Sequence, residues 1–358
     1  MVTRTEEGHG YMQSVYTVSI IIPVYNCISW IEAVIQDILH QTYQDFEIII
    51  IDDGSDDGGG LLCDGFMRMD QRIYVVHTEN HGVSHARNEG IKRARGRYLW
   101  FVDADDRIER ESLSALVFLF LSQENVDLVI GKFENERNLW QSALSGVVDQ
   151  SSFLDDFSKC IHGFYYGALW NKLYKREIIQ NNNLWFPEDL SWCEDYLFNL
   201  EYYSHLKRMV GYISRSVYIY KTRENSLVTK VMLDHRIKVE NQCLERLGRF
   251  AGQNTRIQRA YEDHYAYMKH AQLINMYCAK QGYSKVKHVC MNKEVMEFWK
   301  GYRNPENYPV YRIISLLASA NSSLLIYFFI CLKENLKVGL KKKACFIHKI
   351  IRRPEYHN

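Results

Sequence analysis

The chain has 358 residues, which is enough for two domains or for one domain with an attached helical segment. Its composition, with 47% hydrophobic residues, 24% charged residues and only 5 Pro, excludes disordered, collagen-like and low-complexity proteins. Because 44 Lys and Arg nearly balance 43 Asp and Glu, the whole chain is not a generic nucleic-acid-binding protein.

The two ends of the chain differ in charge. Residues 1–230 contain 22 basic and 33 acidic residues, whereas residues 231–358 contain 22 basic and 10 acidic residues. We therefore expect parts with different roles: an N-terminal extension over residues 1–16, a main domain over 17–230, and a C-terminal region over 231–358.

The cysteine and hydropathy patterns indicate the cellular compartment in which the protein is expected. The nine Cys are scattered, odd in number and never spaced as CxxC, which favours a reducing cytosolic setting over a disulfide framework or a structural zinc site. The N-terminal segment lacks the apolar core of a secretory signal. Polar residues interrupt the apolar stretch from Ile313 to Leu332, so this stretch falls short of a membrane-spanning helix.

Short apolar runs alternate with helix-like stretches over the first third of the chain. The runs begin at Val18, Phe46, Ile73, Tyr98 and Val126. The helix-like stretches cover residues 29–41, 84–94 and 110–121. Near-continuous apolar runs are typical of strands buried on both faces of a largely parallel sheet. The alternation therefore predicts a doubly wound α/β domain.

Polar residues follow three of the predicted strands. Residues 23–26 follow the first strand, residues 52–57 the second and residues 103–106 the fourth. The last two of these loops together contain seven Asp. Since ligands bind at the carboxyl ends of strands in such sheets, we expect the functional site at this edge.

Asp103 and Asp105 stand two positions apart where the fourth strand ends. Carboxylates in this arrangement suit a hard divalent cation that keeps open positions for phosphate oxygens. Such a cation would neutralise a diphosphate leaving group as a Lewis acid. A solvated acidic loop that caps the next helix is the alternative. The apolar strand before the pair and the second acidic loop favour the metal site.

Two other loops each allow two interpretations. The run from Asp52 to Gly54 is either an ordinary turn or the place of a carboxylate that accepts hydrogen bonds from a base or a sugar. The run from Pro23 to Tyr25 is either loop packing or the aromatic wall of a nucleobase pocket.

The C-terminal region reads as helices and ends in a basic segment. Residues 333–358 contain eight Lys or Arg against two Glu. The apolar residues that fall roughly on one helical face of this segment are Leu336, Leu340, Ala344, Ile347 and Ile351. The pattern predicts a basic amphipathic tail that binds an anionic membrane surface.

Five motifs occur in one order along residues 17–225. They read VSIIIPVYN from Val18, QTYQDFE from Gln41, DDGS from Asp52, NHGVSHARN from Asn80 and FVDADD from Phe101. In this order and spacing the set resembles the family 2 glycosyltransferases of the bacterial surface-polysaccharide type. The resemblance implies a GT-A (Rossmann-like) nucleotide-sugar-binding α/β fold as the catalytic domain, followed here by the helical, basic C-terminal region.

The resemblance also implies roles for single residues. Pro23, Tyr25 and Asp53 match the positions that hold the nucleobase, usually uracil. Asp103 matches the first carboxylate of the DxD motif, near the donor ribose and the metal. Asp105 matches the direct ligand of the metal, normally Mn²⁺ or Mg²⁺.

Three basic residues are also expected to bind the donor. Arg87 matches a basic position near the donor, with a structural ion pair to the acidic loops as the alternative. Lys172, in a Trp-Asn-Lys-Leu run, is expected to touch a phosphate, while Trp170 beside it either stacks on a sugar or packs in the core. Arg223, in a segment that resembles the one closing the donor site, is expected to pair with the diphosphate.

Residues 192–198 resemble the ED motif of the same family. An inverting transfer needs one carboxylate to take the proton of the acceptor hydroxyl as that oxygen attacks the anomeric carbon. We assign Asp195 as this base, and Glu194 as a neighbour that orients it or binds the acceptor. An exposed acidic helix start is the alternative for the pair taken alone.

The leading hypothesis is therefore an inverting, metal-dependent glycosyltransferase. It would move a single sugar from a UDP-sugar to a glycan or lipid-linked oligosaccharide acceptor, in the cytoplasm and peripheral to the inner face of the cell membrane. The apolar run beside the basic tail favours lipid over nucleic acid as a partner. A homo-oligomer is left open.

Two other functions are the alternatives. A nucleotidyltransferase on a similar sheet would need a Gly-rich, basic phosphate loop after the first strand, and residues 23–27 do not form one. A non-catalytic membrane scaffold would keep its cellular function without Asp105 and Asp195.

Overall fold

The computed structural model describes residues 16–135, 138–159, 164–190, 192–221, 233–302 and 309–334. The chain divides into two compact units. The first unit comprises residues up to 231 together with 245–257, and the second comprises 232–244 together with the residues from 258 on. The expected N-terminal extension, apart from Tyr16, and the expected basic tail from residue 335 lie outside the described residues.

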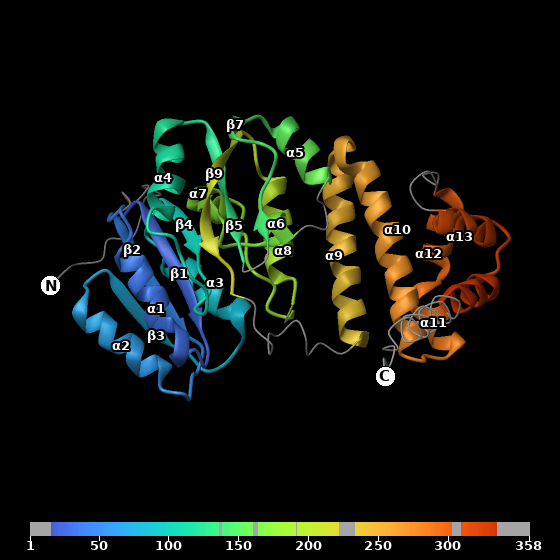
Figure 1. Cartoon of the computed structure of the whole chain (residues 1–358), viewed down its shortest axis with the longest axis horizontal. Helices are drawn as coiled ribbons and strands as arrows, with labels where there is room; N and C mark the ends of the chain where they lie inside the picture. The colour runs from blue at the N-terminus through green and yellow to red at the C-terminus, as the bar shows by residue number, and fades with distance from the viewer. Residues whose placement is uncertain are drawn as a thin grey trace, which may run out of the picture. The chain divides into compact units, whose positions relative to one another are not determined.

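The first unit is built on a mixed sheet (Figure 1). Its strands are β1 (Val18–Val24), β2 (Phe46–Asp52), β3 (Ile73–His77), β4 (Tyr98–Phe101), β5 (Val126–Glu134), β6 (Leu139–Trp140), β7 (Gly146–Val148), β8 (Lys172–Lys175) and β9 (Met209–Ile219). Their order is β3-β2-β1-β4-β8-β5-β9-β7, with β6 paired to β5. β3, β2, β1 and β4 are parallel, whereas β8 lies antiparallel between β4 and β5. β9 runs parallel to β5.

The α/β fold predicted from the sequence is confirmed, and the five predicted apolar runs are β1 to β5. Every side chain of β2 and all but one of β1 are buried, as expected for strands covered on both faces. The sheet is less parallel than predicted, because β6, β7 and β8 lie antiparallel to their neighbours. β8 and β9 were also not predicted as strands. Neither strand has a clear apolar pattern in the sequence, because β8 begins and ends with Lys and a Ser-Arg-Ser run interrupts β9.

Helices connect the strands of the first unit. They are α1 (Ile28–Leu39), α2 (Gly59–Met69), α3 (Val83–Arg93), α4 (Ser112–Ser122), α5 (Gln150–Lys159), α6 (Phe164–Gly167), α7 (Arg176–Asn181) and α8 (Glu194–Ser204). α3 packs against β1 and β2, and α4 packs against β5 and β9. The close packing of α3 depends on Gly90, where a Cβ would lie 2.4 Å from Cγ2 of Ile21.

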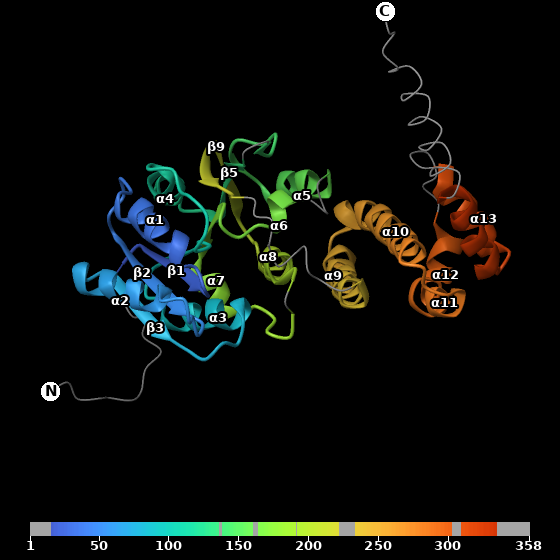
Figure 2. The same cartoon turned by 60° about the horizontal axis from the view of Figure 1, so that its bottom comes forward.

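The second unit is helical, with no strand among its described residues (Figure 2). Its helices are α10 (Thr255–Cys278), α11 (Tyr283–Cys290), α12 (Lys293–Gly301), α13 (Pro309–Ser319), a further helical stretch over residues 323–334, and part of α9 (Leu233–Gln253). Its core includes Leu273, Met276, Val286, Trp299 and Ile330. Within the described residues, no helix has the length and apolar character needed to cross a bilayer.

Candidate active site

The loop that carries the predicted metal ligands is held in place by the end of β9. It follows β4 and contains Asp103, Asp105 and Asp106. The backbone N–H of Asp103 donates to the hydroxyl of Tyr218 over 3.1 Å, and the N–H of Lys221 donates to Oδ1 of Asp106 over 2.8 Å. These bonds fix where the carboxylates of the loop can point.

The same loop concentrates negative charge. Asp106 is buried, and its Oδ2 has no hydrogen-bond partner among the described residues. Burial is the main cause that raises the pKa of Asp106 to about 8, and the nearby Asp103 and Asp105 carboxylates contribute to the same shift. A bound divalent cation would offset this concentration of charge, so the loop fits the metal that the sequence predicts.

Protein ligands for such a cation are few. Among the described residues no group of three or more His, Cys, Asp or Glu could hold a metal ion. Asp103 and Asp105 would therefore leave most coordination positions to oxygens from outside the chain, as Mg²⁺ sites that share their cation with substrate phosphates do.

Arg87 joins this loop to the predicted ED motif. Its Nη2 donates to Oδ1 of Asp103 over 3.0 Å, while Nη1 donates to Oε1 of Glu194 over 2.9 Å and to Oδ1 of Asp195 over 2.7 Å. Burial alone would lower the pKa of Arg87, but the three carboxylates outweigh it and raise the pKa, so the guanidinium stays charged. The predicted metal-loop carboxylate and the predicted base thus share one buried cation.

Apolar packing keeps Arg87 in this position. Its guanidinium carbon lies 5.4 Å from the centre of the Phe186 ring, and that ring stacks on Phe198 with centres 4.1 Å apart. The next residue of α3, Asn88, donates to the carbonyl of Phe186 and accepts from its N–H, over 3.0 and 2.9 Å. α3 therefore holds both the guanidinium and the aromatic side chain beneath it.

Asp195 and Glu194 lie in the first turn of α8, where the helix dipole favours negative charge. Cys193 before them has φ of 63° and turns the chain into the helix. Burial raises the pKa of Asp195, Glu194 and Asp103 raise it further, and Arg87 opposes them. The side chain is still 27% exposed, so a hydroxyl group from solvent can reach it. A carboxylate in this setting has a high affinity for a proton.

Two of the predicted nucleobase residues, Tyr25 and Asp53, lie on the loops after β1 and β2, whereas Pro23 lies within β1. Tyr25 is 51% exposed, as a ring available for stacking would be. Asp53 is buried and accepts hydrogen bonds from the backbone N–H groups of His81 and Gly82, over 2.9 and 2.7 Å. Its carboxylate shapes the loop before α3, and its contact with a base stays a prediction. Pro23 is the sixth residue of β1.

Two expected contacts in the Trp-Asn-Lys-Leu run do not fit the structure. Lys172 is fully buried, and its ammonium donates to the carbonyls of Tyr165 and Ala168 and to Oδ1 of Asn171. No N–H of that ammonium is left for a phosphate. Trp170 is also buried and stacks on Tyr218 with ring centres 4.5 Å apart, so the core-packing alternative holds for it. Arg223 lies outside the described residues.

Some residues that shape the site were given no role by the sequence. Tyr218 and Lys221, which anchor the loop after β4, belong to the same segment as Arg223, but no contact was predicted for either of them, and Phe186 beneath Arg87 lies in no motif. The signal for Asn88 was present, because this residue ends the motif that contains Arg87. The uncharged partners can be identified only once the strands and helices are in place.

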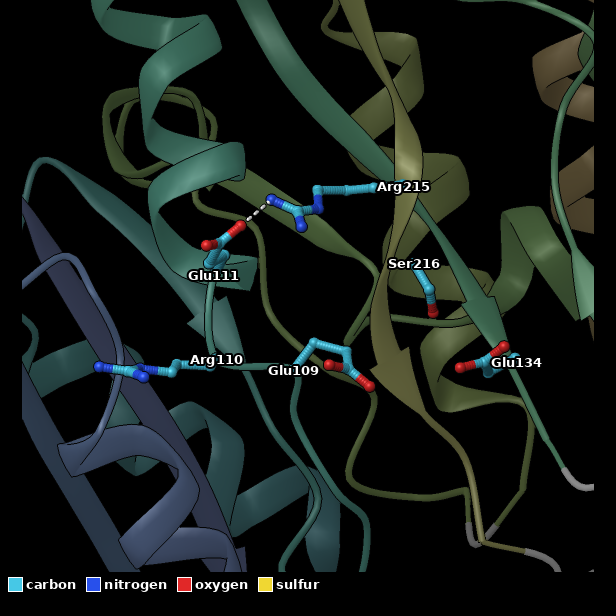
Figure 3. A pocket seen from close by; sticks show the side chains of 6 residues that line it. All are labelled: Glu109, Arg110, Glu111, Glu134, Arg215 and Ser216. Atoms are coloured by element: carbon cyan, nitrogen blue, oxygen red, sulfur yellow. Dashed lines mark hydrogen bonds and ion pairs between the residues drawn. The ribbon is translucent and has the colours of Figure 1, made fainter.

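A shallow pocket of about 390 Å³ lies elsewhere on the first unit (Figure 3). It is lined by Glu109, Arg110, Glu111, Glu134, Arg215 and Ser216. It shares no residue with the cluster formed by Arg87, Asp103, Glu194 and Asp195, which we call the Arg87 cluster. Its Glu111 and Arg215 are each about half exposed and already form an ion pair over 2.5 Å. Its polar, open walls do not resemble a substrate site.

Comparison with known proteins agrees with the site geometry in indicating a glycosyltransferase. Residues 19–181 match the family model described as Glycosyl transferase family 2. EpsJ of Bacillus subtilis, named as an uncharacterized glycosyltransferase, is 34% identical over 239 residues, a match that covers 63% of this chain and 68% of EpsJ. EpsH of the same organism is 31% identical over 219 residues, which are 60% of this chain and 63% of EpsH.

Solved structures show the same fold. TarS from Staphylococcus aureus, residues 1–349 with UDP-GlcNAc, superposes with a TM-score of 0.67 at 19% identity, covering 90% of this chain and 92% of TarS. The mannosyltransferase PcManGT from Pyrobaculum calidifontis, with GDP-Man and Mn²⁺, superposes with a TM-score of 0.52 at 18% identity, covering 90% of this chain and 87% of that one. The fold of the first unit is the GT-A fold of these enzymes.

Proposed function

The chain belongs to glycosyltransferase family 2, and we propose from this premise that it is an inverting, metal-dependent enzyme that moves a single sugar from a UDP-sugar to an acceptor hydroxyl. The observation that carries the proposal is the Arg87 cluster, which brings Asp103 after β4 and Asp195 on α8 to one guanidinium. A donor held at the loop after β4 would then lie beside a carboxylate able to take a proton.

The reaction follows from the position and proton affinity of Asp195. The acceptor hydroxyl loses its proton to the Asp195 carboxylate while its oxygen attacks the anomeric carbon. The bond from that carbon to the diphosphate oxygen breaks, and UDP leaves with the bonding electron pair. Glu194 shares Nη1 of Arg87 with Asp195, and in this way restricts the orientation of the base.

A divalent cation belongs to this proposal. Asp105 and Asp103 would hold Mn²⁺ or Mg²⁺, and when bound the cation would stabilise the charge on the departing diphosphate. Pro23, Tyr25 and Asp53 would contact the nucleobase, and Arg223 the diphosphate. Arg87 would orient the two carboxylates through its ion pairs. Lys172 has no part in donor binding.

The acceptor and the location complete the proposal. We place the acceptor among glycans or lipid-linked oligosaccharides of cell-surface polysaccharide synthesis, and the enzyme at the inner face of the cell membrane. TarS, named for transfer of N-acetylglucosamine to poly(ribitol-phosphate), is 28% identical over 57% of this chain and supports a glycan-type acceptor. The basic C-terminal sequence supports the membrane location.

A UDP-release assay tests the proposed function. Purified protein would be given a panel of UDP-sugars with Mn²⁺ or with EDTA, because slow donor hydrolysis needs no known acceptor. We expect release from one donor that depends on Mn²⁺ and falls at least about 100-fold in Asp105→Asn. Asp189→Asn changes an exposed carboxylate outside the site and should leave the release unchanged. If no donor is bound or cleaved, the scaffold and nucleotidyltransferase alternatives take precedence, and pyrophosphate release from UTP and a sugar phosphate separates them.

A further inference from the structure

The last two helical segments of the second unit are apolar on both sides. Their inner faces contribute Ile314 and Ala318 of α13, and Ile326 and Ile330 of the stretch 323–334, to the buried core. These four residues account for the ordinary packing of both segments.

The opposite faces carry large apolar side chains as well. Five of these side chains are at least half exposed: Leu316, Leu324, Leu325, Phe328 and Leu332. At 100° per residue, the four members in the stretch 323–334 fall within one 100° arc, turned away from Ile326 and Ile330. We call these five residues the outer apolar faces.

Nothing in the described chain explains the outer apolar faces. A helix that is apolar all round is normally buried or lies in a membrane, and contiguous exposed apolar surface marks an interaction site. The described helices include none able to span a bilayer, and no contact within the described residues accounts for these side chains. A partner that covers them from one side does.

The charges around the outer apolar faces identify the chemistry of that partner. The charged residues within 309–334 are Arg312, Lys333 and Glu334, so carboxylates are scarce there. The 24 residues that follow, 335–358, contain seven Lys or Arg and a single Glu. Apolar side chains next to a basic segment match a surface of anionic lipid. A second copy of the chain would offer the same region, in which carboxylates are scarce, and is disfavoured because it brings no complementary charge.

We propose that the outer apolar faces of α13 and of residues 323–334 dock on an anionic lipid bilayer, with Phe328 and the leucines at the boundary between headgroups and acyl chains. This inference deepens the proposed function, because it names the surface that would hold the enzyme at the membrane.

Vesicle flotation of the full chain tests the docking. The probes are vesicles of phosphatidylcholine alone and of phosphatidylcholine with about one third phosphatidylglycerol. We expect wild type to float with the anionic vesicles, and Phe328→Ser with Leu332→Ser to weaken the binding about tenfold. Phe118→Ser is the matched control, since Phe118 on α4 of the first unit is 70% exposed and should not affect flotation.

Two readouts separate the possible results. UDP release without vesicles should be the same in the double variant and in wild type, so that loss of docking is distinguishable from failure of the proposed function. Equal flotation of wild type and the double variant, or equal loss in Phe118→Ser, would overturn the docking. A wild-type dimer in sedimentation that the double variant loses, with no flotation of either, would assign the faces to a second copy instead.

Discussion

Arg87 is a buried charge, and its surroundings explain why the fold retains it. The Arg87 side chain is 3% exposed and its guanidinium meets three carboxylates, so its charge is well compensated. The three carboxylates in turn need this guanidinium. Glu194 and Asp195 at the start of α8 and Asp103 after β4 all form their ion pairs with it. A single side chain thereby sets the distance between the two carboxylates to which we assign the chemistry.

Replacing Arg87 by Met should change the pH profile as well as the rate. Arg87 lowers the pKa of Asp195, so its removal raises that pKa further. A base acts only when deprotonated, hence the acidic limb of log kcat/KM should move to higher pH. Loss of the partner of three carboxylates should also cost about 3–5 kcal/mol of folding free energy at neutral pH, and less in acid where the carboxylates are protonated.

The control for this change is Arg93→Met on the same helix. Arg93 is 41% exposed and pairs with Glu89. We therefore expect the acidic limb of log kcat/KM to stay at the wild-type pH, and the free energy of unfolding to change by no more than about 0.5 kcal/mol. An Arg87→Met enzyme with reduced rate but the wild-type acidic limb would show that Arg87 does not act through Asp195.

Sequence reasoning named charged residues that the structure brings together, and it misjudged a contact of Lys172. Motifs name Arg87, Asp103 and Asp195, and the structure brings these three together. A motif does not say where the protons of a side chain go, however. Lys172 lies in a run from which a phosphate contact was predicted, but its ammonium donates to the carbonyl oxygens of Tyr165 and Ala168. Burial and hydrogen bonding determine whether such a Lys is available to a phosphate, and neither can be read from a short sequence motif.

At the scale of elements, the parallel half of the sheet was predictable and the rest was not. β1 and β2 are long β-branched runs with no competing periodicity. β8 has four residues and β9 is interrupted by polar side chains, so tertiary pairing rather than local pattern makes them strands. α2 was also missed, because its first two residues are Gly, which ordinarily disfavours a helix.

The glycines of α2 have a packing reason that a substitution can test. A Cβ on Gly60 would lie 2.3 Å from Oδ2 of Asp52, the oxygen that meets Nδ1 of His77 at 2.7 Å. We expect Gly60→Ala to destabilise the fold by about 1–3 kcal/mol in urea unfolding. Asp52 is the main cause of the raised pKa of His77, so the same variant should lower that pKa in an NMR titration.

Gly65→Ala is the matched control within the same helix. No atom lies within 4 Å of a Cβ built at Gly65, so helix propensity alone should act and stabilise the protein by about 0.5–1 kcal/mol. If both alanine substitutions stabilised the fold, the close contact between α2 and Asp52 would not affect the free energy of unfolding.

The whole molecule combines an acidic first part with a basic second part. The acidic residues of the first unit include the clustered carboxylates of the site, whereas the second unit is helical and leads into the Lys-rich C-terminal sequence. The near-zero net charge of +1 conceals this division. On our account one part does the chemistry and the other brings it to an anionic surface, which is why the charge of the two parts differs in sign.

Asp195→Asn tests the central claim most directly, by a comparison of donor binding with turnover. The amide keeps the shape of the side chain and can still accept from Nη1 of Arg87, but it cannot take a proton. Calorimetry with the UDP-sugar selected by the release assay, in the presence of Mn²⁺, should give a Kd within about threefold of wild type, while turnover falls by about 100-fold or more. Turnover within about threefold of wild type in Asp195→Asn would contradict the account, because the base would then have to be another group.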